Sequence, residues 1–84
     1  MTVTRSFRGI SVRLARHYLE GLGGEAVDET TVVADDWEAS LSSTTVSIGP
    51  SLNLTEVTVT VEGDDGAVED LMERFAQKAM RAGG

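Results

Sequence analysis

The fold of this chain is decided by residues 37–62, which read WEASLSSTTVSIGPSLNLTEVTVTVE. β-Branched residues dominate both halves of this stretch, and the turn formers Gly49-Pro50-Ser51 separate the halves. Two such runs around a short turn predict an antiparallel hairpin. If the three-residue loop closes symmetrically, Ile48 faces Leu52 and every other pair follows from this one. The two strands are then Trp37 to Ile48 and Leu52 to Glu62.

The apolar residues of this hairpin change parity along both strands. They are odd-numbered near its open end and even-numbered near its turn, with the change around Thr44-Thr45 and Thr55-Glu56. Because strand side chains alternate between the two faces, the change has two explanations. Paired bulges keep every apolar residue on one face, or the end near the turn exposes its apolar residues on the other face. In the second case the candidate interface of a homodimer is Val46, Ile48, Leu52 and Leu54.

The segment after the hairpin predicts a helix. Apolar residues from Val68 to Met80 recur at helical spacing. Acidic residues gather at its start and basic residues at its end, the arrangement that the helix dipole favours. Asp70 and Arg74 are spaced to form an i,i+4 ion pair.

The segment before the hairpin predicts another helix. Apolar residues from Phe7 to Leu22 fall on one helical face. Thr4 or Ser6 can cap its start. Gly9 weakens that first turn, which moves the favoured start toward Ser11.

A third strand is expected at Thr30 to Ala34, where β-branched residues return before a turn at Asp35-Asp36. We therefore expect a single domain over residues 1–84 of the α+β class. Its order is helix, three-stranded antiparallel sheet and helix (αβββα), with both helices on one face of the sheet.

The composition excludes several classes of protein. The chain has no cysteine, which excludes disulfides, thiolate catalysis and cysteine-based metal sites. No segment approaches the ~20 apolar residues that span a bilayer, and the N-terminus has no apolar signal region. We therefore expect a cytoplasmic protein with no membrane contact.

The charge balance is strongly acidic, with 14 acids, seven bases and a net charge of -7. All the bases except Lys78 are arginines. This composition is typical of haloarchaeal proteins, because carboxylates keep a surface hydrated and their repulsion is screened at molar salt. We interpret the acidity as adaptation to a salty solvent.

The bases lie at the two ends of the chain, where the two helices are expected. A basic strip across the helices is a candidate nucleic-acid surface, and the helix–strands–helix order resembles the double-stranded-RNA-binding domain. That family holds phosphates with lysines at the start of its second helix, where this chain has the acidic stretch 63–70. Nucleic acid is therefore not the expected partner. The strip consists of Arg13, Arg16, Arg74, Lys78 and Arg81.

Candidate catalytic and metal-binding groups are few. His17 is the only histidine, with Glu20 as its one nearby carboxylate, and no nucleophile pattern accompanies it. The pairs Asp35-Asp36 and Asp64-Asp65 lie where turns and helix starts favour aspartate, without the spacing of a calcium loop. We therefore expect no catalytic residue, no cofactor and no metal site, and hence no enzyme.

The chain closes on Gly83-Gly84. Ubiquitin-like sulfur carriers and protein modifiers use such a terminus for adenylation, so Gly84 is a candidate modifier terminus. Those proteins resemble a β-grasp fold in which the tail follows a strand. Here the tail follows a predicted helix directly, which also matches an ordinary helix stop.

As a whole, the chain resembles small haloarchaeal proteins. Its element order is also similar to that of the domain that follows the sulfur-carrier module in proteins related to the molybdopterin synthase small subunit. This resemblance covers most of the chain and carries no specific motif. It implies a role beside sulfur transfer or molybdenum-cofactor synthesis.

The leading functional prediction is a non-enzymatic interaction or accessory module with a protein partner, self-associating as a homodimer through the hairpin 37–62. The alternative is a sulfur carrier or ubiquitin-like modifier that uses Gly83-Gly84. A nucleic-acid binder that uses the basic strip ranks third.

Overall fold

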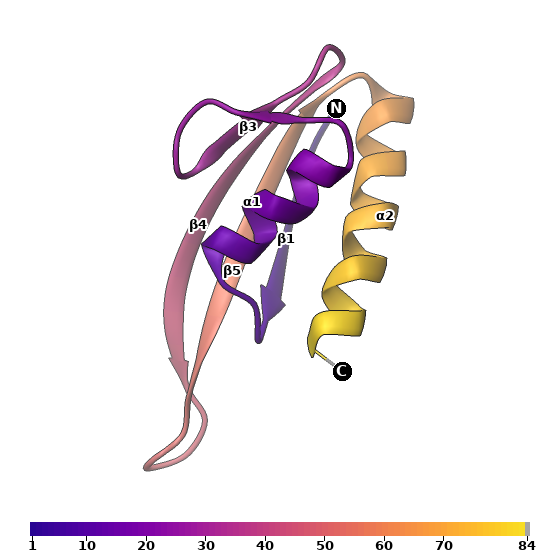
Figure 1. Cartoon of the computed structure of the whole chain (residues 1–84). Coiled ribbons are helices and arrows are strands. Elements are labelled where there is room, and N and C mark those ends of the chain that lie inside the picture. Colours follow the sequence, from indigo (N-terminus) through magenta and orange to yellow (C-terminus); the bar gives the residue numbers. More distant parts are fainter. Residues whose placement is uncertain (84) are drawn as a thin grey trace.

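The computed structural model describes residues 1–83 and the side chains of residues 1–81. Five strands form one antiparallel sheet, and two helices pack on it (Figure 1). The elements are β1 (Thr2–Arg8), α1 (Val12–Gly21), β2 (Glu25–Ala26), β3 (Thr31–Val33), β4 (Trp37–Ser47), β5 (Asn53–Gly63) and α2 (Asp65–Gly83).

The expected sheet of three strands is wrong, although the α+β class holds. The sheet has five strands in the order β1-β5-β4-β3-β2, so the chain is not αβββα. The extra strands are β2 and β1, and β1 occupies part of the segment expected to be the first helix. The N-terminal strand thereby closes the sheet beside β5.

The start of α1 explains why β1 was missed. Val3 and Phe7 lie on the same side of β1 and pack against the core, but Phe7 also fits the helical spacing of the apolar residues that follow. Gly9 separates the two elements with a φ of 87°, a value that glycine adopts without strain. Ser11 then caps α1, because its hydroxyl accepts a hydrogen bond from the Leu14 amide at 3.0 Å.

The β4–β5 hairpin has the register that the symmetric turn predicts. Ala39 pairs with Val61, Leu41 with Val59 and Val46 with Leu54. The ladder runs without interruption from Trp37↔Gly63 to Ser47↔Asn53, which excludes the paired bulges. The apolar residues near the turn therefore lie on the other face of the sheet.

This hairpin has two parts with different neighbours. The hairpin base comprises Trp37–Ser43 with Val57–Gly63, and β1 and β3 pair along most of its two sides. The hairpin tip comprises Thr44–Thr55 and extends beyond both neighbours, so that the molecule measures 44 × 23 × 20 Å.

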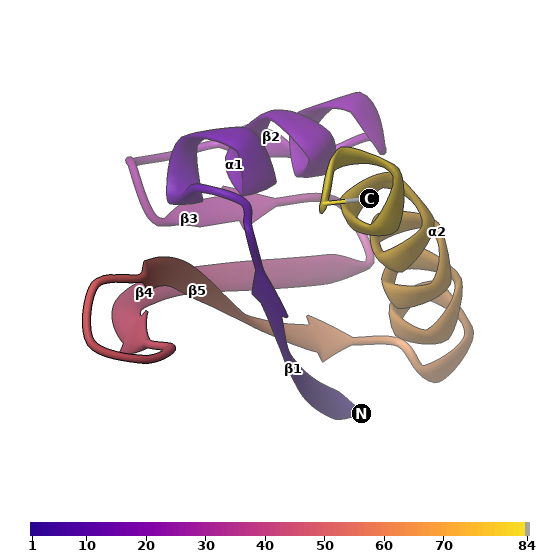
Figure 2. The same ribbon diagram turned by 90° about the horizontal axis from the view of Figure 1, so that it is seen from below.

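Both helices lie on one face of the twisted sheet, where the core forms (Figure 2). Phe75 of α2 is fully buried and packs its ring against Phe7 of β1 and Tyr18 of α1, with centroids 5.0 and 6.0 Å away. The apolar face of the hairpin base supplies the floor of this core. Its buried residues are Trp37, Ala39, Leu41, Val57, Val59 and Val61.

Candidate functional site

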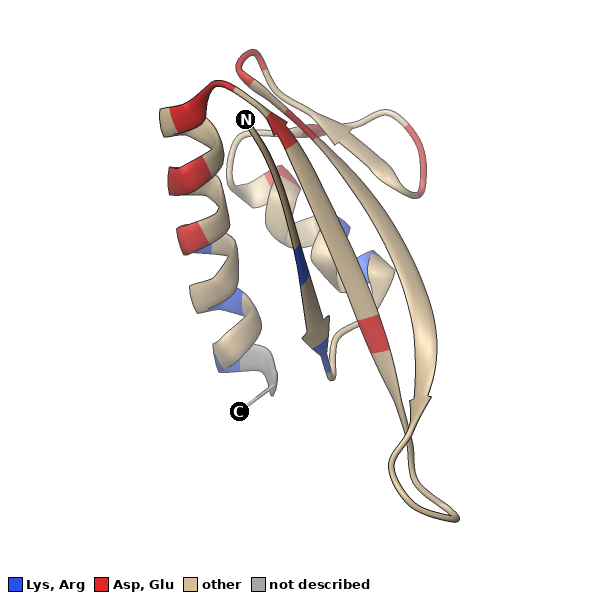
Figure 3. Ribbon diagram, turned by 180° about the vertical axis from the view of Figure 1, so that it is seen from behind, with Lys and Arg blue, Asp and Glu red and all other residues tan. Residues whose placement is uncertain are grey.

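The hairpin tip holds the four residues predicted as an interface. Val46 and Leu54 are half-buried neighbours on the sheet face that the helices do not cover, and Ile48 and Leu52 are 41% and 55% exposed beside the turn. No charged residue lies between Glu38 and Glu56. Figure 3 accordingly shows the protruding end of the hairpin without acidic or basic colour. The tip is therefore an uncharged, partly apolar arm on a strongly acidic protein.

The rest of the uncovered face is polar and was not predicted as a distinct surface. Hydroxyl groups of β1 and β5 face each other in two pairs, Thr4 with Thr60 at 3.3 Å and Ser6 with Thr58 at 3.0 Å. Alternate serines and threonines in these strands were the available signal. Such a face is suited to contact with water. The apolar residues of the hairpin tip therefore differ in character from the rest of the face on which they lie.

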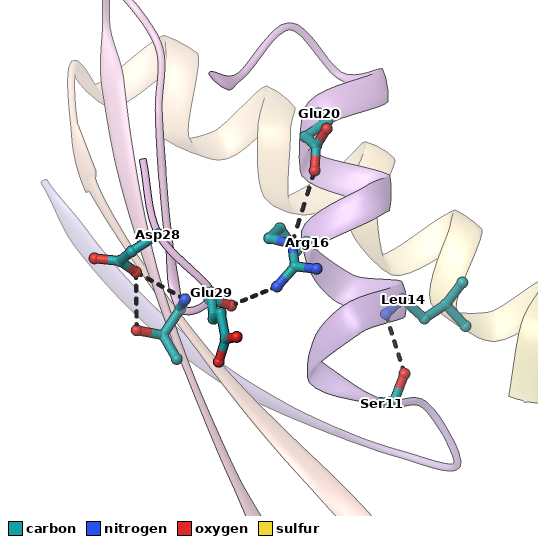
Figure 4. A network of polar contacts seen from close by, with 7 residues as sticks. Ser11, Leu14, Arg16, Glu20, Asp28 and Glu29 are labelled. Atoms are coloured by element: carbon teal, nitrogen blue, oxygen red, sulfur yellow. Dashed lines mark hydrogen bonds and ion pairs between the residues drawn. The ribbon is translucent and has the colours of Figure 1, made fainter. Parts of the chain in front are cut away.

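Arg16 of α1 lies on the flank of the helix that faces the β2–β3 loop (Figure 4). The Arg16 guanidinium donates a hydrogen bond to the Glu29 carbonyl at 3.0 Å and lies 3.9 Å from the Glu20 carboxylate. Arg13 and His17 line the same shallow hollow as Arg16. Arg16 thus connects α1 to the loop, which is a structural role.

The basic residues of α2 form a second, separate group. Arg74 pairs with Asp70 at 3.1 Å, as its spacing predicted. The Lys78 ammonium lies 6.0 Å from the centre of the Tyr18 ring, a cation–π contact between the helices. A groove of about 380 Å³ joins this group to the end of α1, and its lining includes three residues that sequence reasoning did not select. The lining residues are Gly21, Leu22, Arg74, Gln77, Lys78 and Arg81.

The structure thus places the five residues of the predicted basic strip in two groups. Arg13 and Arg16 share the hollow on α1, whereas Arg74, Lys78 and Arg81 share the groove beside α2. Neither lining contains a residue of the other group. The groove lined by Arg74, Lys78 and Arg81 lies on the last part of α2, close to the end of the chain. We name it the α2 basic groove.

Three acidic residues take part in local structure, Asp28 through its side chain and Asp36 and Asp64 through their backbones. Asp28 accepts hydrogen bonds from the amide and the hydroxyl of Thr30, at 2.8 and 3.2 Å, and these bonds lower the pKa of its carboxyl group. The Asp36 carbonyl accepts a bond from the Asp64 amide at 3.0 Å, which joins the β3–β4 turn to the start of α2. Within residues 1–83, no three His, Asp or Glu side chains gather as metal ligands do.

Gly84, the predicted modifier terminus, lies outside the described residues. Gly83 is the last residue of α2, so the helix includes the first glycine of the pair and does not end before it. Within the described part of the chain, neither helix is both long and apolar enough to cross a membrane.

Of the comparisons with known proteins, the match to a family model shows the family of this chain. A search of curated proteins gives no match to this chain. A family model described as archaeal MoaD-like protein matches residues 3–84. The match extends from β1 to the final glycine, and it confirms the predicted similarity to proteins related to the molybdopterin synthase small subunit. The chain therefore belongs to the archaeal MoaD-like protein family.

Proposed function

We propose that this chain works in sulfur transfer, as a sulfur carrier or ubiquitin-like modifier activated at the carboxyl group of Gly84. The observation that carries the proposal is the family match, because it spans residues 3–84 and so includes the glycine pair. The small subunit of molybdopterin synthase, which the family resembles, is a sulfur carrier. This proposal replaces the accessory module as the leading function.

The chemistry requires a free carboxylate on Gly84. One carboxylate oxygen attacks the α-phosphorus of ATP, which forms an acyl-adenylate and releases pyrophosphate. Hydrosulfide then attacks the acyl carbon and AMP leaves, so that a thiocarboxylate forms. A lysine amine in place of hydrosulfide gives an isopeptide bond. The chain supplies the reacting group and a partner enzyme supplies the catalysis, so the chain itself is not an enzyme.

The α2 basic groove supports this function electrostatically. The whole chain carries a net charge of -7, which repels ATP and acidic protein surfaces. The last basic residues, Lys78 and Arg81, lie on α2 within two turns of Gly83. Their positive charge therefore favours the approach of phosphates or an acidic partner at the end that reacts.

The helical position of Gly83 sets a condition on the partner. A partner that binds an extended tail has to unwind the last turn of α2. This costs little, because the last four carbonyls of a helix have no partner within it and a helical glycine is about 1 kcal/mol less favourable than alanine. The activating enzyme is therefore expected to bind the α2 basic groove and the unwound end together.

Intact-mass measurement tests the proposal. The chain ending at Gly84 is incubated with its cognate E1-like adenylating enzyme, Mg-ATP and sulfide in molar salt. The expected result is the mass gain of one oxygen replaced by sulfur, together with ATP–pyrophosphate exchange. A chain without Gly83-Gly84 is the matched control and should show neither.

The groove is tested separately by charge reversal. Lys78→Glu with Arg81→Glu is expected to raise the concentration of chain needed for half-maximal exchange, whereas Arg13→Glu on the other flank should not. If the unmodified chain supports neither exchange nor the mass gain, the sulfur-carrier function is wrong and the accessory role returns as the leading function.

A further inference from the structure

The outer edge of β4 is open along the hairpin tip. The Leu41 amide points outward and donates to the Thr30 carbonyl at 2.8 Å, whereas the Ile48 amide points inward and donates to Leu52 at 2.7 Å. Alternate residues of an antiparallel strand direct their backbone groups to opposite sides. The backbone amides and carbonyls of the odd-numbered residues Ser43, Thr45 and Ser47 therefore point outward, away from β5. They lie beyond the pairing with β3, which ends at Ser40.

These outward groups have no partner within residues 1–83. No described residue forms a backbone hydrogen bond with Ser43, Thr45 or Ser47 on this side. A row of unpaired amides and carbonyls is a template for another strand. This part of β4 is therefore a binding edge by its geometry.

The other long edge of the sheet is protected. β1 directs Thr4 and Ser6 outward, because Met1 and Gly9 make the inward bonds to β5. Charged residues such as Arg5 and Arg8 on an edge strand discourage pairing with another chain. The open edge of β4 contains no charge, no proline and no bulge. The edge of β4 can therefore pair with a strand of another chain, whereas the edge of β1 discourages such pairing.

The charge distribution of the chain indicates that the open edge of β4 can bind a second copy of the chain. Two copies of this chain repel each other over most of their surfaces, because each carries a net charge of -7. The hairpin tip is an exception, since it has no charged residue. It also exposes the apolar side chain of Ile48, which is 41% exposed at the end of β4 and whose burial would stabilise an association.

We propose that two copies of this chain pair through the outer edges of their β4 strands, antiparallel and across a two-fold axis at Val46. An antiparallel edge is complementary to itself under two-fold symmetry. In this register the backbone groups of Thr45 bond those of the partner's Ser47, and the two Val46 side chains meet on the uncovered face. The two sheets become one continuous sheet, and the hairpin tip gains the neighbour that a two-stranded ribbon needs for stability. The pairing does not involve Gly84 and stands apart from the proposed sulfur transfer.

Mass measurement of two proline variants tests the pairing. Thr45→Pro removes an outward amide of β4 without touching the β5 ladder, and Thr4→Pro does the same on β1. Light scattering in molar salt is expected to give twice 8.9 kDa for the unmodified chain and for Thr4→Pro. Thr45→Pro is expected to dissociate, with its dimer weakened by more than about tenfold, because each copy loses a backbone hydrogen bond and gains a steric clash.

A charge variant decides the matter if Thr45→Pro does not fold by circular dichroism. Val46→Glu brings two carboxylates together at the axis and is expected to give a folded monomer at low salt, while Thr4→Glu on β1 remains dimeric. An unmodified chain that is a monomer at 100 µM overturns the proposal. A folded Thr45→Pro or Val46→Glu variant that keeps the dimer mass also overturns it.

Discussion

The base and the tip of the β4–β5 hairpin have the same register but opposite surroundings. In the hairpin base, Val59 is fully buried between β1, β4 and the helices. In the hairpin tip, Val46 continues the same ladder but lies on the uncovered face, and no third strand among residues 1–83 pairs beside it. The difference teaches that one regular ladder can supply both a core and an exposed arm, because the apolar residues change parity while the register does not.

The largest expected effect on the free energy of unfolding comes from replacing a glycine of the hairpin base, compared with the same replacement in the hairpin tip. A Cβ on Gly63 would collide with the Asp36 carbonyl and lie 2.8 Å from the Trp37 Cα, whereas a Cβ on Gly49 would meet nothing within 4 Å. Gly63→Ala should lower the free energy of unfolding by about 3 kcal/mol. Gly49→Ala, with a φ of 92°, should cost about 1 kcal/mol. Urea unfolding in molar salt measures both, and equal losses would contradict the comparison.

The next effect compares two valines. Val59→Ala should lower the free energy of unfolding by about 2 kcal/mol, because it removes buried methyl groups and leaves a cavity. Val46→Ala should cost less than about 0.5 kcal/mol, since Val46 packs on one side only. The comparison is made by urea unfolding at concentrations where the chain is a monomer. A larger loss for Val46→Ala would mean that the hairpin tip is part of the core.

A smaller effect concerns the ion pair at the boundary between the two parts. The Arg8 guanidinium lies 3.0 Å from the Glu56 carboxylate, and the two side chains are 55% and 24% exposed. A double-mutant cycle with Arg8→Ala and Glu56→Ala should give about 0.5 kcal/mol at low salt and less at molar salt. A coupling that does not change with salt would argue against a screened surface pair.

The smallest effect concerns the loop where the pairing of β3 with the hairpin base ends. The Thr30 amide lowers the pKa of Asp28 below its ordinary value of 3.8 in the folded chain. The stabilisation is therefore present above pH 3.8 and is lost as the pH falls through the lowered pKa. Asp28→Asn should lower the unfolding midpoint slightly at pH 6 and by less at pH 2. Thermal unfolding at the two pH values measures this, and a loss that is larger at pH 2 would have the wrong sign.

Local patterns were sufficient to predict the elements that have a single strong period. The hairpin turn at Gly49-Pro50-Ser51, its symmetric register and the apolar stripe of α2 are all written in neighbouring residues. The Asp70–Arg74 pair followed from helical spacing alone. The helical features depend on contacts between residues close in sequence, and the hairpin depends on the single register that its turn sets. The spacing of residues along the chain is therefore enough to predict them.

The candidate sites were predicted less completely. The sequence selected Val46 and Leu54 but left their face open between two explanations, and it joined Arg13 to Arg74 in one strip. The structure places Val46 and Leu54 on the uncovered face, and it separates Arg13 from Arg74 on different flanks. Which flank a helical residue occupies depends on how the helix packs on the sheet, and a single sequence does not state this.

The sequence by itself determined that this is one acidic α+β domain with a long hairpin and a C-terminal helix, because composition and periodicity act over short distances. Only the tertiary structure decided that Thr2–Arg8 is a strand, since its partner in β5 lies more than forty residues away in the chain. The tertiary structure also decided that the ladder has no bulge and that the edge of β4 is open. The open edge depends on where β3 ends, which is set by packing between distant segments.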